Sequence, residues 1–162
     1  TSTGGTDHHI PCIQAGYERA LNWSLPVLSW PDILVGPGLL GGSTILSFEQ
    51  LIIDIEMFKR CKRMARGIDT QESRWLDEVI ERVGPGGNYL GQRSTREALR
   101  GGEWQLSELG VHTPYETWKV NEKDLLAEAR EKIDQALAAH QPLPLDEAAL
   151  KELDRIETCA SK

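Results

Sequence analysis

Apolar residues in the first third of the chain recur at the three- to four-residue spacing of an amphipathic helix. Pro11 suits the first turn of a helix. The helical spacing of apolar residues then continues until Pro26 and Pro31 interrupt it. We therefore expect a helix over about 12–29, whose apolar positions are Ile13, Tyr17, Ala20, Leu21 and Leu28. A short apolar run ending in "GPG" follows and predicts a buried strand over 32–36 that feeds a loop.

The stretch "SFEQLIIDIEMFKRCKRMARG" carries the clearest helix signal in the chain. Ser47 is a typical N-cap residue, acidic side chains come early, basic ones come late, and Gly67 ends the pattern. The apolar stripe consists of Leu51, Ile55, Phe58 and Ala65. We expect this helix to pack on a core through that stripe.

The second half of the chain predicts further helices and no clear strand. Thr70 can cap a helix that ends at the "GPGG" of residues 84–87, and two capping-box spacings predict short helices, Ser94 with Glu97 and Thr113 with Glu116. Longer amphipathic segments open at Asn121 and Asp146 and predict helices near 122–140 and 146–158. These two segments are expected to form an outer helical tail.

A strand, a Gly-rich loop and an amphipathic helix together form the repeating unit of parallel α/β folds. The unit is complete over 32–66 and partial where "TSTGGTD" precedes the helix from residue 12. A complete eight-stranded barrel needs about 250 residues, so we expect an α/β fold that is the C-terminal part of a (β/α)8 barrel. Residues 1–120 would supply that part and residues 121–162 its helical tail. The absence of an initiator Met fits a fragment.

Charge and cysteine content narrow the possible partners and the compartment. The chain has 18 Lys and Arg against 25 Asp and Glu, a net charge of -7, which disfavours binding to nucleic acid or to an anionic membrane. No apolar run approaches a membrane span, and no signal peptide is evident. Three widely spaced cysteines match neither a disulfide framework nor a CxxC site. We expect a soluble protein of the reducing cytoplasm.

The blocks "GGTD", "QAGYERAL", "DILVGPGLL", "SFEQLIIDIEMFKR", "RGID", "GPGGNYLG" and "YETW" occur in the order typical of one protein family. In these blocks the chain resembles the C-terminal end of the trimethylamine methyltransferase family, and the resemblance covers nearly its whole length. The resemblance implies a (β/α)8 barrel that moves a methyl group from a tertiary or quaternary methylamine, such as trimethylamine or a betaine. The acceptor would be the cobalt of cobalamin carried by a cognate corrinoid protein, so this chain itself would bind no cofactor.

The chemistry of such a transfer sets what the site needs. The cofactor carries the difficult step, and the barrel orients the substrate. A cation is best held by aromatic faces, with an acidic group adding Coulombic attraction. Some members of the family use pyrrolysine for tertiary amines, and this chain contains standard residues only, which favours the quaternary branch if that position lies within it. The five Trp residues are too scattered along the sequence to indicate a cage.

The opening stretch "TGGTDHHIPC" resembles a metal site in composition. Adjacent side chains of an extended chain point in different directions, so His8 and His9 are poorly placed to hold one ion, and Cys12 is expected to begin the helix. We expect no metal site. In a barrel this loop would lie at the active-site face, so Asp7 is a candidate substrate-binding residue. The alternative is that Asp7 caps the following helix.

Other candidates for substrate binding follow the predicted strand. The backbone of Gly36, Gly38 and Leu39 could approach a ligand closely, although a plain turn explains them equally well. Glu49 could face a cationic substrate or could simply complement the helix dipole. Tyr17 could reach the barrel mouth or belong to the core. The catalytic residues stay unassigned.

The "GPGGNYLG" loop departs from the family pattern. Members often carry His at the position of Asn88 and another near Ser94, and this chain has neither, which puts the family's chemistry at that loop in doubt. Three readings compete: a fragment of a methyltransferase, a non-catalytic binding module with the same fold, and a dimerising structural unit whose partial barrels cover each other's exposed edges. In each of them the exposed apolar surface of a partial barrel favours a homo-oligomer.

Overall fold

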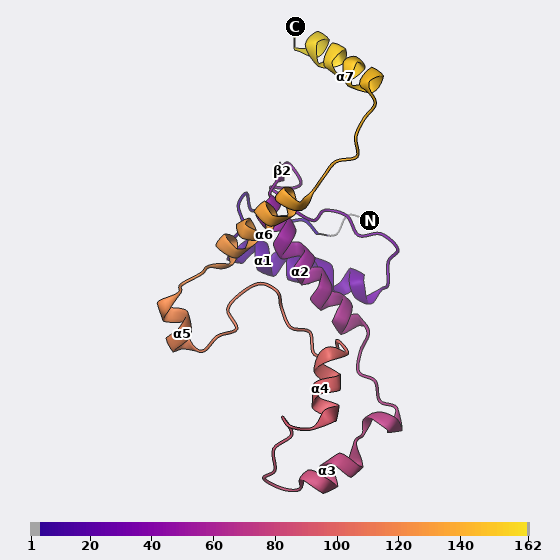
Figure 1. Ribbon diagram of the computed structural model, residues 1–162, viewed down its shortest axis with the longest axis vertical. Helices are drawn as coiled ribbons and strands as arrows, with labels where there is room; N and C mark the ends of the chain where they lie inside the picture. Colours follow the sequence, from indigo (N-terminus) through magenta and orange to yellow (C-terminus); the bar gives the residue numbers. More distant parts are fainter. Residues whose placement is uncertain (1–3, 162) are drawn as a thin grey trace.

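The computed structural model describes residues 4–161 and is dominated by helices within that range. Figure 1 shows α1, α2 and α6 gathered in one body, with α3 and α4 reaching away from it on one side and α7 on the other. The direct contacts join α2 to both α1 and α6. In chain order the elements are α1 (Ile13–Leu28), β1 (Leu39–Leu40), β2 (Ile45–Leu46), α2 (Phe48–Ala65), the 3-10 turn η1 (Glu72–Arg74), α3 (Asp77–Val83), α4 (Arg93–Arg100), α5 (Tyr115–Val120), α6 (Leu125–Ala139) and α7 (Glu147–Ala160).

Helices α1 and α2 pack side by side and run in the same direction. Arg19 contacts Asp54, and the Trp23 ring meets the Phe58 ring edge-on with centroids 5.9 Å apart. Because the residue numbers rise together along both helices, their amino ends lie at one end of the pair and their carboxyl ends at the other. Consecutive helices of a parallel α/β protein have this relationship.

The faces that the two helices bury differ from the expected apolar stripes. On α1 the buried residues are Ala15, Arg19, Trp23 and Val27, whereas Ile13 is 90% and Leu21 69% exposed. On α2 the buried residues are Gln50, Asp54, Glu56 and Cys61, and Ile55 is exposed. The prediction of the buried face was wrong for α1, and for α2 it was right in part, because Phe58 and Ala65 pack against the core whereas Ile55 is exposed. Periodicity of apolar residues does not reveal that a paired Arg and Asp can be enclosed between helices.

The strand predicted over 32–36 is absent as a strand: within the described chain only Val35 makes a single bridge. Gly36 and Gly38 have φ of +100° and +77°, which ends the extended conformation. The one sheet among residues 4–161 is instead an antiparallel hairpin that pairs Leu39 with Leu46 and Leu40 with Ile45. The structure is compatible with part of an α/β protein, but it does not contain the parallel strands that the barrel prediction required in the part described.

Two of the predicted helix caps are confirmed. Ser47 Oγ accepts a hydrogen bond from the backbone N–H of Gln50 at 3.1 Å, and Asp146 Oδ1 accepts one from Ala149 at 2.7 Å. Helices of 18 and 14 residues follow these caps. Each cap satisfies a backbone donor of the first turn that has no partner within its own helix.

The other caps are wrong, although helices do occur near them. Thr70 precedes a 3-10 turn, and α3 begins only after Leu76, whose φ is +58°. Ser94 lies inside α4, which starts after Gln92, and Thr113 is one residue before the N-cap of α5, Pro114. Asn121 ends α5, so α6 is capped by Asp124, which accepts a hydrogen bond from Ala127 N–H at 2.6 Å. Residue pairs with capping-box spacing occur often by chance in a sequence. The backbone conformation decides at which residue a helix begins.

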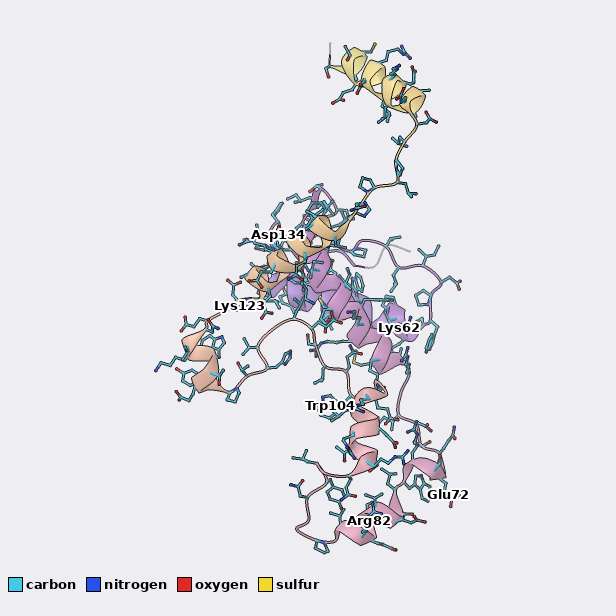
Figure 2. The ribbon with its side chains drawn as sticks, in the orientation of Figure 1. Lys62, Glu72, Arg82, Trp104, Lys123 and Asp134 are labelled. Carbon is cyan, nitrogen blue, oxygen red and sulfur yellow. The ribbon has the colours of Figure 1, made fainter. Side chains whose placement is uncertain are left out.

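The predicted tail divides into two parts that behave differently. Helix α6 packs against α2 and buries Ala129, whereas the side chains of α7 project into open space (Figure 2). Between them lies the Pro-containing connection of residues 140–146. The boundary proposed at residue 120 stays a prediction.

In the described chain, no helix combines the length and the apolar character that crossing a membrane requires.

Candidate functional site

Two loops meet at the amino ends of α1 and α2. The backbone N–H groups of Gly41 and Gly42 donate to the carbonyl oxygens of His8 and Thr6, at 2.9 and 3.0 Å. The ring of His9 lies against Gly41, where an added Cβ would come within 3.0 Å of it. The loop of residues 4–12 and the hairpin region of residues 36–46 therefore form one surface, which we call the amino-end face.

A buried polar network holds the amino-end face onto the helices. Arg19 Nη1 donates to Asp54 Oδ2 at 2.5 Å, and Gln50 Nε2 donates to Asp54 Oδ1 at 2.7 Å. The backbone N–H of Gly38 donates to Asp54 Oδ2 at 2.7 Å, and Arg19 also reaches the carbonyl oxygen of Gly36 at 3.5 Å. One carboxylate thus joins α1, α2 and the Gly36–Gly38 turn.

The electrostatics of this network are governed by burial. Burial raises the pKa of the Asp54 carboxyl, against the opposing effect of its hydrogen bonds to Gly38, Gln50 and Arg19. Burial likewise lowers the pKa of Arg19, while the Asp54 charge acts the other way. Within the described residues, Arg19 Nε and Nη2 are buried and have no hydrogen-bond partner. Removing either member of such a pair leaves the other as an uncompensated buried charge.

Sequence reasoning did not single out Arg19 or Asp54, and it assigned no role to Gln50. The available signal was the placement of an amide and an acid four residues apart within the otherwise apolar "QLIIDI" of residues 50–55. Residues with that spacing share one helix face. No spacing rule connects them to Arg19, which is 35 residues from Asp54 in the sequence.

Asp7 lies at the surface of the amino-end face. Its backbone N–H donates to Glu18 Oε2 at 3.2 Å. The N-cap position of α1 is Cys12, so the alternative in which Asp7 caps this helix is wrong. The side chain of Asp7 is exposed and, within residues 4–161, takes part in no hydrogen bond or ion pair, which leaves its charge directed to solvent.

Glu18 anchors the Asp7 loop to α1. Its carboxylate accepts hydrogen bonds from Thr6 Oγ1 at 2.5 Å and from Gln14 Nε2 at 2.9 Å, besides that from Asp7. These bonds, led by the one from Thr6, lower the pKa of Glu18. Thr6 itself is only 3% exposed. The loop is therefore held in place by an ionised carboxylate.

Glu49 occupies the first turn of α2, as predicted, and is already paired. Its Oε1 accepts a hydrogen bond from Arg130 Nε of α6 at 3.1 Å, and its Oε2 accepts one from Ser47 Oγ at 3.0 Å. Its own backbone N–H, Arg130 and Ser47, in that order, lower its pKa. The pairing supports a structural role beside the helix-dipole effect. A substrate-binding role stays a prediction.

Gly36, Gly38 and Leu39 lie at the same face, with their backbone groups turned mostly inward. The N–H of Gly38 is bonded to Asp54, and the N–H of Leu39 donates to the carbonyl of Gly36 at 3.2 Å. A Cβ added to Gly38 would come within 3.0 Å of Leu51 Cβ and 3.1 Å of Leu46 Cδ1. The glycine at position 38 is therefore explained by close packing, and contact with a ligand stays a prediction.

The remaining candidates have local explanations or lie elsewhere. His8 Nδ1 is 3.0 Å from the Ile10 carbonyl oxygen. Among residues 4–161, no three His, Cys, Asp or Glu side chains are grouped so that they could hold a metal ion. Tyr17 is 56% exposed, so it does not belong to the core. Asn88 accepts a hydrogen bond from Leu90 N–H at 2.8 Å in the loop between α3 and α4, far from the amino-end face in Figure 1.

The structure brings together some of the aromatic side chains that are scattered in the sequence. Trp75, Tyr89 and Trp104 line one cavity of about 320 Å³ between α3 and α4. Trp118 packs near Tyr115 with ring centroids 5.9 Å apart. Trp30 and Phe58 line a separate cavity near the carboxyl ends of α1 and α2. None of these rings lies at the amino-end face.

Comparison with known proteins agrees with the resemblance seen in the sequence blocks. Trimethylamine methyltransferase MttB of Methanosarcina barkeri (strain Fusaro) is 32% identical over 157 residues, which cover 97% of this chain and 32% of that protein. The corresponding protein of Methanosarcina thermophila is 33% identical, over 91% of this chain and 30% of its own length. A glycine betaine methyltransferase of Desulfitobacterium hafniense (strain Y51) is 30% identical, over 82% of this chain and 28% of its own length.

The chain thus spans about a third of the length of these curated relatives. A family model described as trimethylamine methyltransferase (MTTB) matches residues 1–158, which is nearly the whole chain. The chain belongs to the trimethylamine methyltransferase family.

Proposed function

We propose that this chain is part of an enzyme that transfers a methyl group from a quaternary or tertiary methylamine to the cobalt of a cognate corrinoid protein. Family membership over residues 1–158 carries the proposal, together with relatives that are named trimethylamine and glycine betaine methyltransferases. We place the chain at the C-terminal end of a (β/α)8 barrel, as the resemblance implies. The corrinoid is a partner's group in this proposal and not a cofactor of this chain.

The arrangement of the helices supports the position of the substrate. In a (β/α)8 barrel the active site lies where strands end and the following helices begin. The loops of residues 4–12 and 36–46 and the first turn of α2 all meet at the amino ends of the parallel pair α1 and α2. Asp7, Gly36, Gly38, Leu39 and Glu49 therefore share the end of the molecule where a substrate would bind in a barrel.

The chemistry divides between partner and protein. In the transfer, the reduced cobalt attacks the methyl carbon, the carbon–nitrogen bond breaks with its electron pair kept by nitrogen, and a carbon–cobalt bond forms. The unpaired carboxylate of Asp7 would attract the cationic substrate, and the buried Arg19–Asp54 pair would hold the Gly36–Gly38 turn in position. Positioning of this kind is the protein's main contribution when a cofactor supplies the reactivity.

A methyl-transfer assay tests the proposal. The full-length protein that contains this chain is mixed with its corrinoid protein in the cob(I) state and a panel of methylated amines, and methyl-cobalamin is followed by absorbance. We expect at least one quaternary or tertiary amine to methylate the cobalt. If none does, while the same corrinoid protein is methylated by methyl iodide, the reaction is wrong and a non-catalytic module is favoured.

Two variants test whether Asp7 and Glu49 bind the substrate, separately from whether the reaction occurs. Asp7→Asn removes the exposed charge, and we expect a higher KM for the amine with little change in kcat. Glu49→Gln disturbs the contact with Arg130, and the same effect is expected if Glu49 also faces the substrate. The matched control is Asp134→Asn on α6, a surface residue labelled in Figure 2. Unchanged kcat and KM in both test variants would leave the reaction standing and remove these residues from the site.

A further inference from the structure

Helix α7 carries an apolar face that is open to solvent. Leu150, Leu153 and Ile156 recur every three residues on one side of the helix, and each is about half exposed. The helix projects away from the body that α1, α2 and α6 form (Figure 1). A helix of 14 residues is only marginally stable in water when nothing packs against it. A partner that covers this face would therefore stabilise α7.

The charges around this apolar face indicate what kind of partner would fit. With about 3.6 residues per turn, Asp154 and Glu157 border the face on one side and Glu152 borders it on the other. The two basic residues of the helix, Lys151 and Arg155, lie on the opposite side. A matching surface combines an apolar floor with basic side chains at its edge.

An open pocket of about 370 Å³ has this combination. Residues of α1 and α2 and the segment between α4 and α5 line it. Its apolar lining includes Met57, Cys61 and Met64 of α2, and its basic lining is Arg60 and Arg63. Both methionines of the chain lie here, and flexible methionine side chains adapt well to a docked helix. We call this surface the Met pocket.

The two arginines of the Met pocket carry charge that carboxylates neutralise only weakly. Arg60 lies 3.8 Å from Glu56. Arg63 donates to the backbone carbonyl oxygens of Glu103 and Gly67, at 3.0 and 2.8 Å, and these acceptors are uncharged. Among the described residues, no acidic side chain lines the Met pocket. Acidic side chains of a partner would therefore meet positive charge there.

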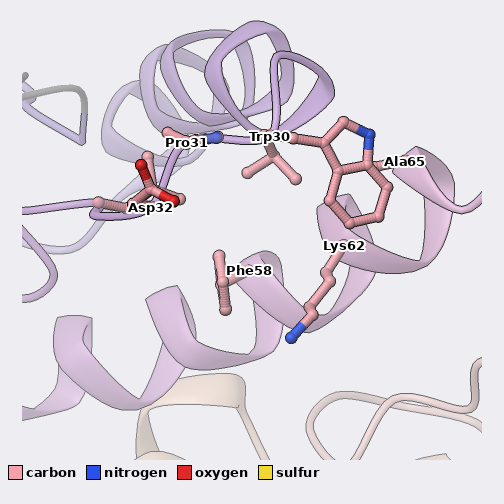
Figure 3. A pocket seen from close by; sticks show the side chains of 8 residues that line it. Trp30, Pro31, Asp32, Phe58, Lys62 and Ala65 are labelled. Carbon is pink, nitrogen blue, oxygen red and sulfur yellow. The ribbon is translucent and has the colours of Figure 1, made fainter.

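The two other large pockets match α7 less well. The cavity at Trp30 carries the carboxylate of Asp32 as well as Lys62 (Figure 3), so it would repel an acidic partner on one side. The cavity lined by Trp75 and Trp104 has no charged side chain in its described lining. Charge complementarity therefore favours the Met pocket.

We propose that α7 of one copy of the chain docks in the Met pocket of a second copy. Leu153 and Ile156 would enter the pocket, in the manner of an amphipathic helix bound in a groove. The bordering acids of α7 would face Arg60 and Arg63. Reciprocal exchange of α7 between two copies closes a two-fold dimer.

The arrangement in Figure 1 is the reason for choosing a second copy. Helix α7 stands beyond α6 at one end of the molecule, whereas the carboxyl half of α2, which lines the Met pocket, points toward α4 at the other end. In this arrangement α7 is directed away from the Met pocket of its own chain. The inference does not depend on the methyl-transfer reaction.

Nuclear magnetic resonance of mixed full-length chains tests the docking directly. One chain carries isotope-labelled methionine methyl groups and Cys159→Ser. An excess of a second chain, without isotopes, carries a nitroxide on Cys159, the exposed cysteine of α7, with Cys12→Ser to direct the labelling. We expect the Met57 and Met64 methyl signals to broaden in the mixture, because the nitroxide of one copy comes close to the pocket of the other.

Two results would overturn the proposal. The first is the absence of broadening in the mixture at every concentration tested. The second is broadening that occurs only when the isotopes and the nitroxide are on the same chain, diluted with unlabelled chain, because α7 would then fold back onto its own pocket. A nitroxide-treated chain that carries both Cys12→Ser and Cys159→Ser is the control for labelling at the buried Cys61.

A matched pair of variants tests the apolar face of α7. We expect Leu153→Asp, in the spin-labelled chain, to weaken the docking by at least about tenfold, because it places a charge where an apolar side chain is buried. Lys151→Asp introduces the same side chain on the opposite side of the helix and should leave the docking unchanged. Equal effects of the two variants would contradict the assigned face.

A second matched pair tests the basic edge of the pocket. We expect Arg60→Glu, in the isotope-labelled chain, to weaken the docking by about threefold or more through repulsion of the acids on α7. Lys62→Glu makes the same kind of charge change on the side of α2 that lines the Trp30 cavity, and it should have no effect. If Lys62→Glu weakens the docking as much as Arg60→Glu, net charge alone explains the association and the inference is wrong.

Discussion

Arg19 of α1 and Asp54 of α2 form an ion pair with a 2.5 Å Nη1–Oδ2 distance, and both side chains are wholly buried. The same carboxylate accepts the backbone N–H of Gly38. This pair therefore fixes the relative position of two helices and of the turn between them. It connects the packing of the helix pair to the geometry of the amino-end face.

Removing one member of the pair should lower the free energy of unfolding far more than replacing both members by apolar residues. We expect Asp54→Leu to lower the free energy of unfolding by about 3–5 kcal/mol, because Arg19 is left buried without a counter-ion. The double variant Arg19→Met with Asp54→Leu should recover at least about half of this loss, since no buried charge remains. Urea unfolding followed by circular dichroism measures both. Equal losses in the single and double variants would show that the pair's charges do not matter.

Gly38 and Gly42 form a matched pair for testing close packing at the turn. Both have positive φ, but a Cβ at Gly38 would press on Leu51 and Leu46, whereas that at Gly42 would meet open space. We expect Gly42→Ala to cost about 1 kcal/mol from the backbone conformation alone. Gly38→Ala should cost at least about 1 kcal/mol more. Thermal unfolding of the two variants compares them, and equal Tm values would contradict the packing argument.

The hydrogen bonds to Glu18 predict a pH dependence for the loop that carries Asp7. The pKa of Glu18 is lowered in the folded state, so its stabilising effect is present above the ordinary Glu pKa and is lost as pH falls through the folded pKa. We expect the backbone amides of Asp7 and His8 to lose protection from hydrogen exchange as the pH falls through the folded-state pKa of Glu18. Glu18→Gln should exchange faster at neutral pH and lose this dependence. A parental pH profile in Glu18→Gln would contradict the assignment.

The exposed face of α1 predicts self-association of the chain. Ile13, Leu21 and Leu25 are 90%, 69% and 72% exposed on a single helix. Contiguous apolar surface of this kind promotes association in water. We expect sedimentation velocity to show a concentration-dependent oligomer, which the double variant Leu21→Glu with Leu25→Glu shifts toward monomer. Leu143→Glu, at a 90% exposed position in the connection before α7, is the control and should leave association unchanged.

The network at Asp54 shows where prediction from the sequence stopped. The helix over 48–65 was predicted almost to the residue, because its cap and its charge distribution are local properties. Its partner across the interface is 35 residues away, and no local pattern encodes that contact. The same holds for the cavity at Trp30 and Lys62, whose lining comes from two elements.

The sequence by itself determined the positions of most helices, the Ser47 and Asp146 caps and the family, because side-chain spacing, capping and family-typical blocks are properties of the linear chain. Only the tertiary structure decided which helix faces are buried, that residues 39–46 pair as an antiparallel hairpin, and that Asp7 faces solvent instead of capping α1. These features depend on contacts between distant segments. The physical reason is that burial and pairing are decided by the partner across an interface, here Arg19 for Asp54, and neither residue alone identifies that partner.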